Sequence, residues 1–212
     1  HNTVENIGRL LAAAKSAGWL ASPARAEHVA FGSILGPDKK PFKTRDGETV
    51  RLAALLEEAI GRASVAVTEK NPALDEAARA VVARQIGIGA VKYADLSSDR
   101  VKDYIFDWDR MLAFEGNTAP YIQYVHARVH SIFRRAETAD IASAKSGAVL
   151  LHAPAERALA LELLAFGSVV DGVAESLQPH RLCTYLFTVA TRFNTFYDQC
   201  PVLKAEDEVI RR

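Results

Sequence analysis

Residues 116 to 135, GNTAPYIQYVHARVHSIFRR, begin with loop-forming residues and continue with a helical pattern of apolar and polar positions. At 100° per residue, one arc of this helix is predicted to be buried and collects Ile122, Val125, Val129, Ile132, Phe133 and Ala136. A second, separate arc, here called the aromatic–cationic stripe, collects Tyr121, Tyr124, Arg128, Ser131 and Arg135. Two interpretations of this stripe stay open. It is either a surface on which a flat base stacks while cations meet phosphate, or a core boundary with solvated tyrosine hydroxyls.

The rest of the chain is predicted to be mostly helical after one early strand. Residues 3 to 17 predict an amphipathic helix closed by Gly18, and EHVAFGSIL at 27 to 35 is the best strand candidate. From residue 51 onward the helical pattern is interrupted at Asn71-Pro72, Ser97-Ser98, Gly116-Asn117, 138 to 148, Gly167, Gly172 and Gln178-Pro179. Pro72 and Pro179 are both expected at helix starts. The last helix is predicted to bury the row Leu182, Leu186, Val189, Phe193 and Phe196.

Composition narrows the class of protein. The chain has 212 residues, of which 49% are hydrophobic and 25% charged, which suits one large or two small folded domains. No apolar run approaches the roughly 20 residues that cross a bilayer, and no leader pattern is seen at the start, so a soluble cytoplasmic protein is expected. Cys183 and Cys200 have no paired spacing, so reduced, structural thiols are expected.

Positive charge is concentrated locally, although the formal net charge is zero. The segment GPDKKPFKTR, residues 36 to 45, carries Lys39, Lys40, Lys43 and Arg45 against Asp38 alone. A lysine-rich loop directly after a strand can close over a polyphosphate and offset charge that develops on leaving pyrophosphate. The alternative is a solvated basic hairpin.

Several signatures of enzyme chemistry are absent from the sequence. The sequence does not contain GxGxxG, GxxxxGK[ST], GxSxG or HExxH. It therefore lacks the residues for dinucleotide binding, the common phosphate loop, the hydrolase elbow and zincin chemistry. His126 and His130 have a chelating spacing, but no third ligand is obvious nearby, so no metal site is expected. The acid pairs Glu57-Glu58 and Asp107 with Asp109 are interpreted as solvated helix faces or caps. The end of the chain, KAEDEVIRR, begins a helical pattern without a stop signal and predicts a truncated final domain.

Three blocks of the sequence carry a resemblance to a known family. They are HVAFGSILGPDKKPFKTRDGETVRLAALLEEA at 28 to 59, IGIGAVKYADLSSDRVKDYIFDWDRMLAFEGNTAPYIQYVHARVHSIFRR at 86 to 135, and FNTFYDQCPVL at 193 to 203. Together they resemble the C-terminal part of an arginyl-tRNA synthetase, a class I aminoacyl-tRNA ligase. The resemblance implies a mainly α fold. A helical-bundle anticodon-binding domain would follow a small α/β remnant of the class I nucleotide-binding (Rossmann-like) catalytic domain.

The same resemblance implies an ATP-phosphate loop at 36 to 47, the counterpart of the class I KMSKS signature. Aligning PFKTRDG with the family's looser KMSKR-AG form sets Thr44 where the second lysine stands, and Lys43 or Lys40 is the candidate substitute. The implied catalytic residues are Lys43, Thr44 and Arg45. The implied ATP-binding residues are Lys40, Lys43 and Gly47, with Mg²⁺ as the counterion of ATP.

The second half is implied to read the tRNA anticodon. The loop AFEGNT at 113 to 118 resembles the family's omega-shaped anticodon loop, and the implied RNA-binding residues are Asn117, Tyr121, Tyr124 and Arg128. We expect a catalytic remnant at 1 to 60, a helical connector at 61 to 100, and a C-terminally truncated anticodon-binding domain at 101 to 212.

The expected function is the C-terminal part of arginine–tRNA ligase, which joins arginine to its cognate tRNA with ATP. The expected partners are arginine-specific tRNA and, in the full-length enzyme, ATP and arginine; no membrane is involved and a monomer is expected. The HIGH signature does not occur and residues 1 to 10 fit the family poorly, so the chain alone is expected to be inactive. The alternatives are a non-catalytic synthetase-like tRNA-binding module and a helical protein-interaction domain.

Overall fold

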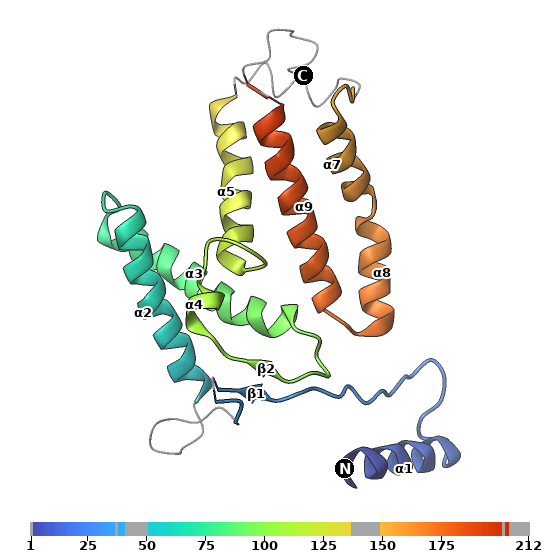
Figure 1. The fold of residues 1–212 in the computed structure, drawn as a ribbon. Coiled ribbons are helices and arrows are strands. Elements are labelled where there is room, and N and C mark those ends of the chain that lie inside the picture. Colours follow the sequence, from blue (N-terminus) through green and yellow to red (C-terminus); the bar gives the residue numbers. More distant parts are fainter. Residues whose placement is uncertain (1, 37, 41–50, 137–148, 201, 204–212) are drawn as a thin grey trace.

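The computed structural model describes residues 2–36, 38–40, 51–136, 149–200 and 202–203 (Figure 1). The expected loop residues Lys43, Thr44, Arg45 and Gly47 lie outside this part of the chain, as does the predicted break at 138 to 148.

The described chain is mainly helical and carries a small parallel sheet. Its elements are α1 (Asn2–Ser16), β1 (Ile34–Leu35), α2 (Leu52–Lys70), α3 (Glu76–Ser97), β2 (Tyr104–Ile105), α4 (Trp108–Met111), α5 (Ala119–Arg135), α7 (Pro154–Leu164), α8 (Phe166–Ser176) and α9 (His180–Gln199). In Figure 1, α9 stands between α5 and the α7–α8 pair, and α3 runs beneath this bundle with α2 packed against it. Helix α1 lies apart, at the end of an extended segment.

Polar caps set several helix starts. The Asp75 carboxylate accepts the Ala78 N–H at 2.8 Å and begins α3. The prediction that this helix starts at Pro72 was therefore wrong, because the aspartate supplies the acceptor that a free helix N-terminus needs. Gly18 follows α1 with a φ of 74°, as the sequence predicted.

The interruptions predicted at Gly167 and Gly172 were also wrong. Both glycines lie inside α8, and the break between α7 and α8 falls at Ala165. A glycine in a helix costs only about 1 kcal/mol relative to alanine, which packing against α9 can offset.

The predicted strand at 27 to 35 is mostly extended chain without a ladder. Only Ile34 and Leu35 form a strand, in parallel register with Tyr104 and Ile105. An extended segment becomes a strand only where a neighbour supplies backbone partners, and the residues before Ile34 find few of them. The Gly32 N–H donates to the Arg100 carbonyl at 2.6 Å.

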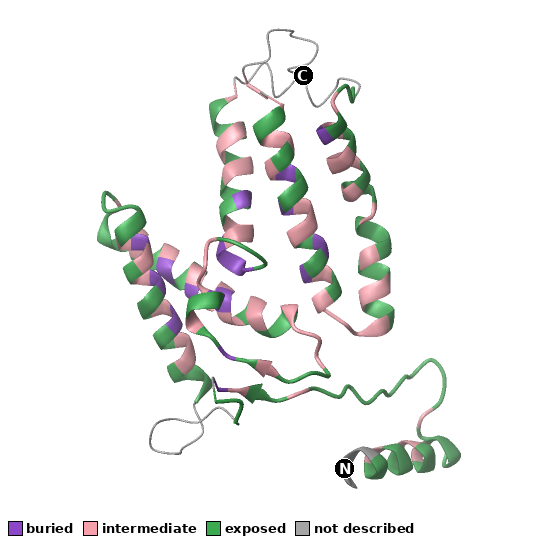
Figure 2. Ribbon diagram, in the orientation of Figure 1, coloured by how far each residue is buried: buried purple, intermediate pink, exposed green. Residues whose placement is uncertain are grey.

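Two packed regions hold the fold together (Figure 2). Between α5 and α9, Val125, Ala190 and Phe193 are buried, and further apolar side chains surround them. Between α2 and α3, the buried residues are small: Ala59, Ala63, Val67, Ala83, Gly87 and Ala90. Phe133, predicted to be core, is 57% exposed because it lies at the edge of the buried arc near the end of α5.

Candidate nucleic-acid interface

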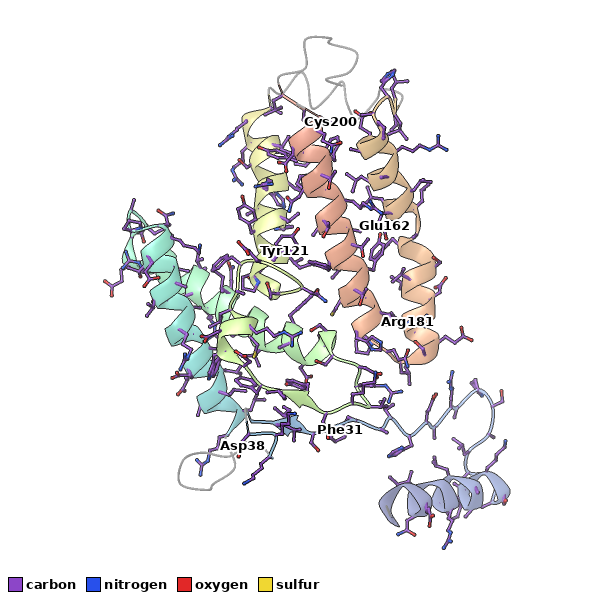
Figure 3. All side chains as sticks on the ribbon, in the orientation of Figure 1. Phe31, Asp38, Tyr121, Glu162, Arg181 and Cys200 are labelled. Carbon is purple, nitrogen blue, oxygen red and sulfur yellow. The ribbon has the colours of Figure 1, made fainter. Side chains whose placement is uncertain are left out.

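The aromatic–cationic stripe of α5 is extended by two residues of α9. Tyr121 lies between the two helices in Figure 3, and the Asn194 Nδ2 donates to its hydroxyl at 2.9 Å. The Asn194 Oδ1 accepts from Arg128 Nη1, also at 2.9 Å. Arg128 Nη2 donates to the Tyr124 hydroxyl. One continuous hydrogen-bonded network thus joins the three predicted stripe residues.

The guanidinium of Arg128 is also held by two aromatic rings. Its central carbon lies 4.8 Å from the ring centroid of Tyr124 and 4.8 Å from that of Tyr197. Both distances are within the range of a cation–π contact. Asn194 and Tyr197 were not predicted as site residues. Residues three apart on a helix lie on the same face, so the spacing of Asn194 and Tyr197 could have indicated a shared site. The apolar row of α9 was the stronger pattern and predicted only core packing.

Burial divides the stripe between the two interpretations that the sequence left open. Tyr121 packs against the Val125–Ala190–Phe193 cluster, and its ring centroid lies 5.6 Å from that of Phe187. Its ring is therefore partly buried, while its hydroxyl belongs to the hydrogen-bonded network. Tyr124 is 48% exposed, and its ring contacts Arg128 rather than the core. It offers an accessible aromatic face of the kind on which bases stack.

Asn117 lies away from the stripe network. Its Oδ1 is 2.6 Å from the Tyr93 hydroxyl, which is also 2.9 Å from the Cys183 carbonyl, so one phenol proton faces two acceptors. Burial, with a smaller contribution from the charge of Cys183, raises the pKa of Tyr93 far above its ordinary value. The contacts tie the 113–118 loop to α3 and α9. Thr118 joins the two ends of the loop, since its hydroxyl donates to the Ala113 carbonyl at 2.6 Å.

A cavity of about 350 Å³ lies beside this loop and was not predicted from the sequence. Its lining includes Tyr93, Asn117, Tyr104 and Arg110. Burial, followed by the charge of Asp95 and its hydrogen bond, raises the pKa of Tyr104 to about 12. The lining phenols therefore remain neutral hydrogen-bonding groups at physiological pH.

The described start of the basic loop forms a tight turn directly after β1. The Gly36 N–H donates to the Lys40 carbonyl at 2.8 Å, and the Lys39 N–H donates to the Gly36 carbonyl at 2.9 Å. Lys39 and Lys40 are exposed. In Figure 1, β1, which this turn follows, lies below α3, whereas α5 and α9 lie above it, so the turn and the stripe are not brought together.

His126 and His130 lie close together on α5. The Nε2 atoms of His126 and His130 are 3.0 Å apart on the surface of α5. Within the described ranges no group of three histidine, cysteine or acidic side chains is placed to hold a metal ion. In the same part of the chain no helix combines the length and apolar character that a membrane span requires.

Two family models match this chain, one in each half. Residues 4–108 match the family model described as tRNA synthetases class I (R), catalytic domain. Residues 122–212 match the DALR anticodon binding domain. The short parallel sheet with its flanking helices is thus a fragment of a class I aminoacyl-tRNA synthetase catalytic domain, and the bundle is its anticodon-binding domain.

Curated relatives and solved structures identify the family. The chain is 54% identical over 200 residues to the arginine–tRNA ligase of Thermobifida fusca, covering 93% of this chain and 34% of the relative. It is 52% identical over 199 residues to that of Alcanivorax borkumensis, covering 94% and 34%. Among solved structures, Thermus thermophilus arginyl-tRNA synthetase superposes with a TM-score of 0.70 at 33% identity, covering 87% of this chain and 31% of that one. The Plasmodium falciparum arginyl-tRNA synthetase gives 0.79 at 27%, covering 99% and 35%. The chain belongs to the arginyl-tRNA synthetase family and spans about a third of the length of the curated relatives it matches.

Proposed function

We propose that this chain is the part of an arginine–tRNA ligase that supplies the ATP-phosphate loop and recognises the tRNA anticodon. The observation that carries the proposal is the network of Tyr121, Tyr124 and Arg128 on the α5–α9 face, which lies largely in the region matched by the anticodon-binding model. An exposed tyrosine ring beside a guanidinium suits unstacked bases and their phosphates. Asn117 contributes by shaping the adjoining loop.

The role proposed for residues 36 to 47 is to bind ATP during arginine activation. Lys40 is exposed on a turn that projects from β1, which suits a cation that meets phosphate. Lys43, Thr44, Arg45 and Gly47 continue this loop in the sequence. Positive side chains at this position would offset the charge that moves onto pyrophosphate as the adenylate forms. Mg²⁺ enters only as the counterion of ATP.

The proposed organisation follows the sequence expectation. Residues 1–60 are the end of the catalytic domain, 61–100 connect it to the bundle, and 101–212 bind the anticodon. The partners are arginine-specific tRNA, with ATP and arginine in the whole enzyme, which we propose to be monomeric and cytoplasmic.

A binding experiment tests the RNA-recognition role. We expect Tyr124→Ala and Arg128→Ala each to weaken binding of arginine tRNA by about 1–3 kcal/mol, the scale of a lost stacking or bidentate contact. Filter binding at fixed salt measures this, with Arg9→Ala on α1 as the control for loss of a positive charge elsewhere. Unchanged affinity in both stripe variants would refute the proposal. Equal weakening for tRNAs with unrelated anticodons would show a nonspecific phosphate surface instead.

The catalytic part of the proposal has a separate assay. ATP–pyrophosphate exchange should be absent from this 212-residue chain alone, with or without tRNA. Exchange by the isolated chain would show that its own residues complete the adenylation site. That result would contradict the proposal that the chain supplies only the ATP-phosphate loop and anticodon recognition.

A further inference from the structure

The chemistry of arginine fixes the direction of every hydrogen bond in the stripe network. A guanidinium has only donors, so the Asn194 atom that faces Arg128 must be its amide oxygen. The amide nitrogen of Asn194 is then the atom that faces Tyr121, and it donates to the Tyr121 hydroxyl oxygen. The orientation of this amide is therefore set by its partners and is not arbitrary.

The same reasoning assigns both phenol protons. The Tyr121 oxygen accepts from Asn194, and the Tyr124 oxygen accepts from Arg128. Each hydroxyl keeps its own proton, and among the residues that the structure describes neither proton has an acceptor. Two of the five guanidinium N–H groups of Arg128 are used within the network, and the others are also donors.

We propose that the α5–α9 face is a hydrogen-bond donor array that selects acceptor atoms of single-stranded RNA, and that Asn194 is the positioning residue that sets this polarity. The ligand chemistry is an acceptor oxygen, from a phosphate or from a base carbonyl; an exocyclic amino group of a base would meet donors and be disfavoured. The inference rests on the proposed function and adds to it which groups of the RNA the face accepts.

An isosteric substitution of Asn194 reverses the polarity. In Asn194→Asp both carboxylate oxygens accept, so Arg128 keeps its partner, whereas Tyr121 must turn its proton inward to the carboxylate. The Tyr121 hydroxyl then has no proton left to donate to the ligand. The Tyr121 ring and its packing against Phe187 need not change.

A double-mutant cycle tests this reversal, with an arginine tRNA anticodon stem–loop as the probe. In the wild type, Tyr121→Phe should weaken binding about 3- to 10-fold, the loss of one hydrogen bond. In the Asn194→Asp background the same change should alter binding by less than about twofold, because the Tyr121 proton is already turned away. Thermal unfolding of each variant checks that the bundle stays folded.

The matched control is Gln199→Glu, which adds an equal charge isosterically at an exposed position of α9. In that background Tyr121→Phe should keep its full effect. An equal cost of Tyr121→Phe in the Asn194→Asp and wild-type proteins would overturn the polarity assignment, as would no cost in the wild type. Failure of the wild-type chain to bind the stem–loop at all would remove the proposed function, and this inference with it.

The source of the acceptor is found with modified stem–loops. One set carries a single methylphosphonate in the loop, and the other carries a base analogue that lacks one carbonyl oxygen. The modification that weakens binding to wild type but not to Tyr121→Phe identifies the partner as phosphate or base. Stronger weakening from deletion of an exocyclic amino group than from either acceptor deletion would contradict the proposal.

Discussion

Gly87 gives the sharpest test of how α2 is held against α3. A Cβ added at Gly87 would lie 2.7 Å from the backbone carbonyl carbon and oxygen of Ala59 in α2. A helix backbone cannot rotate aside as a flexible side chain does, so the helices would have to separate. Gly61, on α2, has no such neighbour, since nothing lies within 4 Å of its added Cβ.

The two glycine-to-alanine changes should therefore have opposite effects on stability. Alanine gains up to about 1 kcal/mol over glycine in a helix, so Gly61→Ala should raise the free energy of unfolding by about 0.5–1 kcal/mol. At Gly87 the same gain is outweighed by overpacking, which typically costs about 1–3 kcal/mol, so a net loss of up to about 2.5 kcal/mol is expected. For a chain of this size each kcal/mol moves Tm by roughly 2–4 °C.

Thermal unfolding followed by far-ultraviolet circular dichroism measures both variants against the wild type, and urea unfolding gives the free energies directly. A Gly87→Ala protein as stable as Gly61→Ala would refute the reasoning. It would show that α2 and α3 separate at no cost and that the close backbone approach does not hold them together.

Three further outcomes are expected. Arg100 donates to the carbonyl of Ala30 at 2.6 Å and to that of Leu177 at 2.8 Å. Neither methionine nor lysine can bind both carbonyls as the guanidinium does, so Arg100→Met and Arg100→Lys should each raise amide hydrogen exchange in residues 30–33 about tenfold. Unchanged exchange would contradict this bridging role. The pKa of Tyr104 is about 12 in the folded state and near the ordinary 10.0 in the unfolded state. The free energy of unfolding should therefore fall as the pH rises through this window. Tyr104→Phe should make that fall shallower, which urea unfolding at alkaline pH measures. Phe193 is buried and Phe133 is exposed, so Phe193→Ala should cost about 3–5 kcal/mol of stability and Phe133→Ala below about 1 kcal/mol. Denaturant unfolding measures both, and equal losses would place the two rings in the same environment.

Helical periodicity predicted the α5 face well because its information is local. The spacing of Tyr121, Tyr124 and Arg128 placed them on one arc, and the structure joins them in one network. Periodicity could not predict Asn194, the residue that joins Tyr121 to Arg128. Asn194 lies 66 residues from Arg128 and 73 from Tyr121 in the sequence, so only the packing of α9 against α5 makes it a partner.

The strand prediction failed for a related reason. Residues 27 to 33 have a β-like composition, but a ladder requires a neighbouring strand, and the described structure gives them mainly isolated contacts. One of these is Arg100, whose guanidinium bridges this segment to the turn between α8 and α9. A long polar side chain in the turn after α3 predicts no particular acceptor, so this bridge could not be predicted from the sequence.

The two glycines of IGIG, residues 86 to 89, are explained by the position of α3, which packs against both α2 and α5. Gly87 faces the backbone of α2, and Gly89 faces the Gln123 side chain of α5, whose Nε2 would lie 2.7 Å from an added Cβ. Two residues along a helix turn the chain by about 200°, so the two glycines open opposite sides of α3. The contact toward α2 is made by the backbone of Ala59 and Ile60, which cannot move aside as a side chain can. The contact toward α5 is made by the flexible side chain of Gln123, which can move aside.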